Sequence, residues 1–253
     1  MMMLEIKVKS RFKAMNHEMV FGLPSPVSIY SFLNTVLNAF NLMENNKITY
    51  DEYYKDKFYY LVRECKLVKD ANNSPVQKRS VFRLENKARA KTILDTPIGF
   101  IDASIFVKWN YEEELNSEEK EMIKKRVRFL GNLPKELKLY FHKQHSDENE
   151  EAFIRRVLKK SGGKLVYPEP IKNKGKLILD EIIDKTFNEA ETYPSTIGYR
   201  VITETNSPLK NKHFFVEPLL GLINIKSVYQ LNTDDFKNKS FQLKEKADII
   251  YFS

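Results

Sequence analysis

The stretch from Phe21 to Phe40 constrains the fold more than any other part of the sequence. A glycine and two prolines end the element before it, and Ser25 offers a side-chain oxygen to the free amides of a new helix, with Pro26 suited to its first turn. Apolar residues then recur at helical spacing on one face: Ile29, Tyr30, Phe32, Leu33, Val36, Leu37 and Phe40. The opposite face carries small uncharged polar side chains. We predict a helix whose apolar face packs on a core and whose polar face is a contact surface.

Composition narrows the class of protein. The 253 residues carry a formal net charge of +8, with a pI near 9.2, and 42% of them are hydrophobic. A chain of this length buries a real core, and its basic balance favours a polyanionic partner such as nucleic acid. The single cysteine, Cys65, excludes an internal disulfide and a cysteine-based zinc site, so we expect an inert core thiol there. Without a signal-peptide pattern or a membrane-length apolar run, we expect a cytoplasmic protein that contacts no membrane.

Alternation of apolar and polar residues predicts the strands. It places them at 4–8, 58–69 and 101–109, and again at 196–205, 213–217, 222–231 and 247–252. A capping box at Asn116 opens a helix to about Leu130, with Gly131 as its stop. With a further strand in 76–92, the order strand, helix, strand, strand, strand, helix is close to the ferredoxin-like arrangement of an RNA-recognition domain. We predict an α+β chain with a ferredoxin-like (RRM-like) core and a β-rich C-terminal part.

Residues 132–192 differ in texture and predict a helical basic insertion within a single RNA-binding protein that spans 1–253. Helices are expected at 134–145, from a capping box at Asp147 to Gly162, and at 177–191. On the first of these helices, His142 and His145 would share one face. We expect an exposed histidine pair there and no metal site.

Three clusters of Lys and Arg are the strongest lead to function. In the first, over 78–91, cations interleave with apolar residues, so that one side packs while the other presents arginines to phosphates and bases. Taken together, the clusters predict a composite nucleic-acid surface, although each alone is also typical of a solvated face. The cations expected to bind RNA are Arg79, Arg83, Lys87, Arg89 and Lys91, then Arg155, Arg156, Lys172 and Lys174, and finally Arg126 and Arg128. The Lys/Arg-Gly-aromatic pattern of a standard RNA-recognition strand is absent, so base stacking on the sheet is not expected.

Motifs of the common enzyme classes are missing. The sequence has no phosphate-binding loop, no dinucleotide-binding glycine turn and no nucleophile elbow. His17 follows the first strand, where a metal-independent ribonuclease could hold a general base for the RNA 2′-hydroxyl. A surface loop histidine is the preferred interpretation, because no second catalytic partner with matching spacing can be identified.

Two stretches resemble a known family. Phe21-Gly-Leu-Pro-Ser-Pro-Val-Ser-Ile-Tyr-Ser-Phe-Leu33 is similar to the helix start of one subunit of the type I-F CRISPR surveillance complex, the Csy complex. Gly198-Tyr199-Arg200, followed by His213-Phe-Phe-Val-Glu-Pro218, resembles the C-terminal signature of the same subunit. The segments 99–109 and 128–131 fall in matching order between them. The family is the Cas-five branch of the repeat-associated (RAMP) proteins.

The resemblance implies a ferredoxin-like core that pairs with the large and backbone subunits of a CRISPR effector. It implies that the chain caps the 5′ handle of the CRISPR RNA without catalysing a reaction and without a cofactor or metal. Gly22, Leu23 and Pro24 would shape the turn beside the RNA, and Tyr199 and Arg200 fall in the C-terminal signature. The chain looks shorter than other members, so a contact with target DNA stays open.

Two alternatives stay open beside this interpretation. One is a RAMP endoribonuclease that processes repeat RNA with His17 as its general base, although the glycine-rich C-terminal loop of such enzymes is missing here. Pro218 to Leu222 holds one glycine only. The other is a scaffold protein that binds no nucleic acid and whose charge is incidental.

Overall fold

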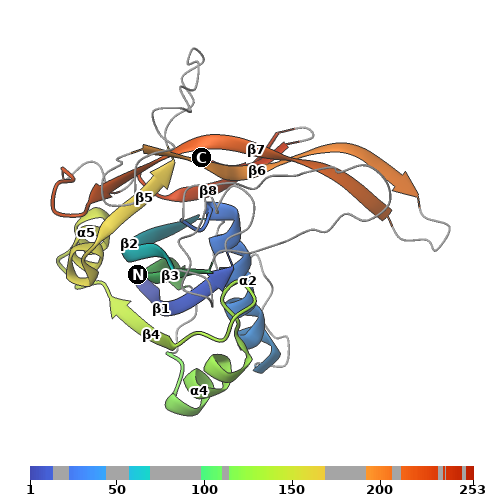
Figure 1. Cartoon of the computed structure of the whole chain (residues 1–253). Helices are drawn as coiled ribbons and strands as arrows, with labels where there is room; N and C mark the ends of the chain where they lie inside the picture. Colours follow the sequence, from blue (N-terminus) through green and yellow to red (C-terminus); the bar gives the residue numbers. More distant parts are fainter. Residues whose placement is uncertain are drawn as a thin grey trace.

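The strands of this chain form one antiparallel sheet. The computed structural model describes residues 1–13, 23–43, 57–68, 98–109, 114–168, 192–206, 212–232, 236, 238–246 and 249–253. Within these ranges lie three helices and nine strands, so the predicted α+β class is confirmed. The strand order is β4-β1-β3-β2-β5-β7-β6-β9-β8 (Figure 1).

The N-terminal half contributes four strands in the order β4-β1-β3-β2, with a helix between the first and second strand and another between the third and fourth. Both helices pack against the same face, where alternate side chains of β1 and β3 form the main core. Side chains at the intervening positions therefore point to the opposite face. The elements are β1 (Met2–Lys13), α2 (Pro26–Met43), β2 (Lys57–Val68), β3 (Ile98–Trp109), α4 (Ser117–Arg126) and β4 (Glu136–Lys143).

Helix α2 follows its sequence prediction closely. Ser25 caps it, since the backbone N–H of Ser28 donates to Ser25 Oγ at 3.2 Å. The apolar stripe is buried, with Ile29, Phe32 and Leu33 among its members. The predicted polar face is the solvent side of the helix, where Ser31 and Thr35 are exposed.

Helix α5 (Glu150–Ser161) covers part of the opposite face. Its apolar side chains, including Phe153 and Val157, form a second core with Met3, Tyr59 and Phe106 from the sheet. Because these sheet residues lie near the start of β1, the end of β3 and the first half of β2, none of the described helices covers the other half of that face. One half of this sheet face is therefore apolar and covered by α5, and the other half is left uncovered by α5.

The C-terminal strands close a ring with β2. Strand β8 pairs with Lys57 and Phe58 of β2, while β5 pairs with Tyr60 to Val62 of the same strand. Aromatic rings fill the junction: the ring centroids of Phe58 and Phe241 are 5.3 Å apart, and those of Tyr30 and Phe252 are 5.1 Å apart. The elements are β5 (Lys164–Pro168), β6 (Thr192–Asn206), β7 (Lys212–Ser227), β8 (Phe241–Lys246) and β9 (Ile249–Phe252).

The helix predicted at 134–145 is wrong, because residues 136–143 form the edge strand β4. Leu137 and Leu139 are buried while Lys138 and Tyr140 are exposed, which is the two-residue period of a strand. All eight residues pair with β1, and this tertiary pairing overrides the local helical pattern. The predicted histidine pair on one helix face is therefore wrong as well.

Helix α4 confirms its predicted start and corrects its end. The capping box is formed, with Glu119 N–H donating to Asn116 Oδ1 at 3.0 Å and Asn116 N–H donating to a Glu119 carboxylate oxygen at 2.6 Å. The helix ends at Arg126, before the predicted Leu130. Leu130 and Gly131 both have positive φ and form a tight turn instead.

Three further boundaries differ from the sequence prediction. Helix α5 is capped by Asn149, whose Oδ1 accepts from Ala152 N–H at 2.8 Å, and the predicted cap Asp147 lies outside it. The two strands predicted at 213–217 and 222–231 are one continuous strand, β7. Strand β8 was not predicted, since only Phe241 and Leu243 carry the alternation there.

Gly198 provides a test of the ring. A Cβ at this position would overlap the carbonyl oxygen of Ile250 and the backbone of Tyr251 in β9. We expect Gly198→Ala to lower the free energy of unfolding by about 2 kcal/mol, because neither backbone can move without breaking strand pairing. Glu245→Ala, at an exposed position of β8, is the control and should stay within about 0.5 kcal/mol of wild type in urea unfolding. Equal stability of the two variants would contradict the close packing of β6 on β9.

Candidate nucleic-acid interface

A charged surface occupies the part of the sheet that α5 leaves uncovered. The register places side chains of four strands next to one another on this face: Lys7 lies opposite Lys138 of β4 and Ser104 of β3, and Arg11 lies opposite Phe100. We call this surface the open sheet face. It consists of Lys7, Lys9, Arg11, Glu64, Lys66, Phe100, Asp102, Glu136, Lys138 and Tyr140, with Glu64 paired to Lys66.

Some cations of the open sheet face are paired and others are not. Lys9 Nζ lies 3.3 Å from Asp102 Oδ2, and Lys138 Nζ lies 3.1 Å from Glu136 Oε1. The side chains of Lys7 and Arg11 form no hydrogen bond or ion pair with any residue that the structure describes. Lys7 also faces Lys138 directly across the β1–β4 ladder, where like charges disfavour pairing. The surface therefore keeps a positive excess next to acids that are already engaged.

The titration of Glu136 shows the same imbalance. A hydrogen bond from Lys138 lowers the pKa of this carboxyl, and the positive charges of Lys138, Lys9 and Lys7 lower it further. Three lysines thus act on a single carboxylate. An anionic ligand would meet the cations that this acid cannot neutralise.

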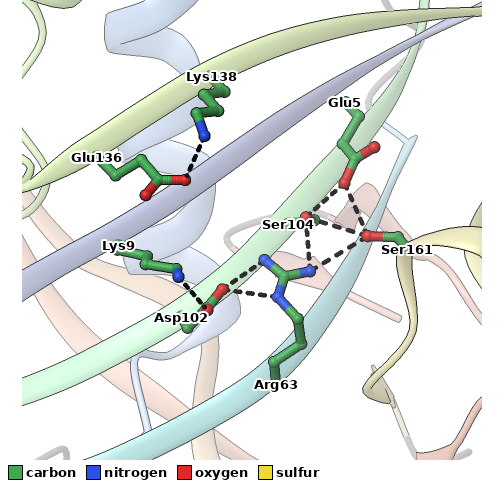
Figure 2. A network of polar contacts seen from close by, with 8 residues as sticks. All are labelled: Glu5, Lys9, Arg63, Asp102, Ser104, Glu136, Lys138 and Ser161. Atoms are coloured by element: carbon green, nitrogen blue, oxygen red, sulfur yellow. Dashed lines mark hydrogen bonds and ion pairs between the residues drawn. The ribbon is translucent and has the colours of Figure 1, made fainter.

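Arg63 marks the border between the open and the covered half of the face (Figure 2). It is the extra residue of a β-bulge in β2. Its Nε donates to Asp102 Oδ1 at 2.7 Å, and its Nη1 donates to Ser104 Oγ at 3.0 Å and to Ser161 Oγ at 3.2 Å. One guanidinium therefore links β2 and β3 to the last residue of α5.

A buried carboxylate completes this link. Glu5 Oε1 accepts from the hydroxyls of Ser104 and Ser161, both at 2.7 Å, and Glu5 Oε2 lies 2.9 Å from His142 Nε2. Burial raises the pKa of Glu5, but the hydrogen bonds from His142, Ser104 and Ser161 outweigh burial and hold the pKa below its ordinary value. The network joins α5 to β1, β3 and β4.

The structure assigns internal contacts to several residues predicted to bind RNA. Leu23 and Pro24 are buried, and the side chain of Leu23 belongs to the main core. Arg156 is engaged by Glu148, with Nε to Oε1 and Nη2 to Oε2 both at 2.8 Å. This contact lowers the pKa of Glu148 to about 2. Arg128 donates to backbone carbonyls at the C-terminal end of α4, those of Lys125 and Val127.

Two of the three predicted cationic clusters, those of α4 and α5, lie on different faces of the sheet. Arg126 is exposed at the end of α4, which packs on the same face as α2. Arg155 is half-buried on α5, which packs on the other face. Figure 1 shows the two helices well apart. Arg126 and Arg155 therefore do not share a surface, while the first cluster lies outside the described residues and the composite surface stays a prediction.

The C-terminal signature lies in the sheet. Tyr199 and Arg200 are exposed on β6, where they pair with Pro218 and Glu217 of β7. The remaining predicted residues lie outside the described part of the chain: Gly22, His17, Arg79, Arg83, Lys87, Arg89, Lys91, Lys172 and Lys174.

Sequence analysis did not single out Lys7, Arg11 or Lys138, which the structure brings together on the open sheet face. The signal was present in the alternation of β1, where Lys7 and Lys9 alternate with Ile6 and Val8. It went unused because a polar strand face is usually just solvated. What separates these lysines from a solvated face is the neighbouring strand, which the sequence pattern assigned to a helix.

Cys65 is buried, as predicted. Among the described residues, no group of His, Cys, Asp and Glu side chains is arranged to hold a metal ion. Within the same ranges, no helix has both the length and the apolar composition needed to cross a bilayer.

Comparisons with known proteins find similarity in structure but no family match. No family model matches the chain, and no curated protein matches it. Among solved structures, the chain is similar to a CRISPR protein from Archaeoglobus fulgidus, with 8% sequence identity and a TM-score of 0.36. The superposition covers 99% of each chain.

The Glu5 network predicts a specific dependence of stability on pH. A depressed carboxyl pKa stabilises the folded state above the ordinary value of 4.5, and this contribution is lost as pH falls through the folded pKa. We expect Glu5→Gln to cost about 2 kcal/mol of unfolding free energy at neutral pH, with the difference from wild type shrinking toward pH 3. Chemical unfolding across this range measures it.

Glu64→Gln is the matched control, because Glu64 is an exposed carboxylate on β2 of the same sheet. It should track wild type within about 0.5 kcal/mol at every pH. A Glu5→Gln deficit that stays constant with pH would show that the carboxylate charge is not the stabilising feature.

Proposed function

We propose that this chain is a non-catalytic, RNA-binding subunit of a type I-F-like CRISPR effector complex. In this role it holds the 5′ handle of the CRISPR RNA and assembles with the large and backbone subunits. The observation that carries the proposal is the cationic open sheet face, whose Lys7 and Arg11 have no anionic partner among the described residues. The ordered motifs at 21–33 and 198–218 supply the family resemblance.

The arrangement of the N-terminal half supports the same assignment. We propose that β1-α2-β2-β3-α4-β4 is a ferredoxin-like core, since its element order and its strand order β4-β1-β3-β2 match that arrangement. Both helices pack on one face of this unit, and the second face carries the cations. A surface of this kind binds nucleic acid through phosphate neutralisation, which is strongly salt-dependent.

The proposal assigns no bond-breaking step to the chain. The general-base candidate His17 has no catalytic partner identifiable in the sequence. The protein would therefore bind guide RNA that another enzyme has processed, and it would act by holding that RNA in place.

Handle binding can be tested directly. We expect the purified chain, with the large subunit, to bind CRISPR RNA more tightly than the same RNA with a scrambled 5′ handle. Affinity should fall as salt rises, because each phosphate contact on a single strand contributes about 0.7 to the logarithmic salt slope. Fluorescence anisotropy at several salt concentrations measures both quantities. Equal affinity for the scrambled RNA would contradict handle recognition.

The same samples separate the competing functions. Metal-free incubation with repeat RNA, followed by denaturing electrophoresis, should leave the RNA intact for wild type and for His17→Ala. Cleavage by wild type that His17→Ala abolishes would establish the endoribonuclease instead. Absence of RNA binding under low salt would favour a scaffold protein.

A further inference from the structure

We propose that the open sheet face binds an extended single-stranded nucleic acid, whose phosphates follow β1 along Lys7, Lys9 and Arg11. This inference rests on the proposed RNA-binding function, and it assigns that function a site which differs from the helical clusters predicted from the sequence. The ligand chemistry is a row of phosphodiesters, which single-stranded RNA and single-stranded DNA share.

The spacing of the cations supports a single strand. Lys7, Lys9 and Arg11 occupy every second position of β1, and two residues of an antiparallel strand rise about 6.8 Å. This step is close to the separation of successive phosphates in an extended nucleic-acid strand. The row is one cation wide on β1, and Lys138 of β4 adds a second contact beside Lys7.

The charges of the face are arranged for an anion that is not part of the chain. Asp102 is shared by Lys9 and Arg63, and Glu136 is held by Lys138. These acids are therefore already neutralised, so they repel an incoming phosphate less than free carboxylates would. A bound phosphate would reduce the electrostatic repulsion between Lys7 and Lys138, which are directly opposite each other on the paired strands β1 and β4.

Aromatic side chains flank the cation row on both sides. Phe100 lies directly opposite Arg11, and Lys66 Nζ stands 5.7 Å from the centroid of its ring. Tyr140, which is 42% exposed, lies two positions from Lys138 on β4. Aromatic faces next to a cationic track accept stacked bases of any sequence. A single strand supplies such unpaired bases, whereas a duplex does not.

The boundary of the site is built into the fold. Ser161, at the end of α5, is held by Glu5 and Arg63, so α5 covers Met3 and Phe106 and stops before Lys7. The bound strand would therefore enter at Arg11 and turn away at Glu5. The accessible row holds three cations of β1, which fits a short segment of about four nucleotides.

A charge-matched pair of triple variants tests the site. The sheet variant carries Lys7→Glu, Arg11→Glu and Lys138→Glu. The control variant carries Lys125→Glu, Lys226→Glu and Lys244→Glu, which are exposed cations of α4, β7 and β8. Both change the net charge equally, so a general electrostatic effect acts on both. Fluorescein-labelled single-stranded RNA, single-stranded DNA and duplex RNA of about 15 nucleotides serve as probes.

The expected result is a loss confined to the sheet variant. Its affinity for single-stranded RNA should fall at least tenfold, and its salt slope should flatten by about 2, since three contacts at about 0.7 each are removed. The control variant should stay within about threefold of wild type. Circular dichroism and thermal melting establish that both variants are folded. Should the reversed charges prevent folding, Lys7→Gln with Arg11→Gln keeps the test with a smaller expected loss.

The outcomes separate the site from the proposed function. If wild type binds the RNA and the sheet variant binds it equally well, the site is wrong and the proposed function stands. If wild type binds no probe at low salt, both are wrong. A larger loss in the control variant than in the sheet variant would show that the control cations bind the RNA and that the open sheet face does not. Tighter binding of the duplex than of the single strands would contradict a single-stranded ligand. Equal loss on the RNA and DNA probes supports phosphate recognition along β1.

Discussion

The alternation of side chains in β1 is the constraint on which this structure depends. Leu4, Ile6 and Val8 are almost fully buried beneath α2 and α4, and the burial of this stripe fixes which way the strand faces. A slip of one residue would place lysines in the core, so the register is strongly determined. Once it is set, Lys7 and Lys9 must lie on the second face. The cationic surface is thus a geometric consequence of the core and requires no loop to position it.

The hydrogen-bond network of Glu5 with Ser104, Ser161 and His142 forms a joint between α5 and the sheet. Its position determines how much of the second face α5 leaves uncovered. A buried carboxylate is costly unless its oxygens are satisfied, and here hydroxyls of Ser104 and Ser161 and the imidazole of His142 satisfy them. This requirement ties the last residue of α5 to one place on the sheet. The apolar residues of α5 supply the affinity for the sheet, while the joint supplies its position. Displacing α5 along β1 would take the Ser161 hydroxyl away from the buried Glu5, so the helix ends where the lysine row begins.

Local chemistry was readable in the sequence, and tertiary pairing was not. Ser25 and Asn116 predicted two helix starts correctly, because a capping side chain bonds to a backbone N–H only three residues further along the sequence. Residues 136–143 were assigned to a helix although Leu137, Leu139 and Phe141 stand at alternate positions, because so short an alternation does not by itself decide between helix and strand. Pairing with β1 decides it. The same pairing brings Lys138 beside Lys7, so the site could not be recognised before the strand was.

Counting cations along a sequence says little about which of them can bind. Arg156 belongs to a strongly basic helix, yet both ends of its guanidinium contact Glu148, eight residues earlier, and a phosphate would have to compete with that carboxylate. Lys7 stands in an ordinary amphipathic strand, yet it faces another lysine and lies beside acids that have partners already. Whether a cation can bind a phosphate depends on whether it is already paired with a carboxylate. In a sheet, the strand register decides which charged side chains face one another. The cation row of β1, flanked by aromatic rings of the neighbouring strands, is therefore the better candidate for a phosphate-binding site than the denser cluster of cations on α5.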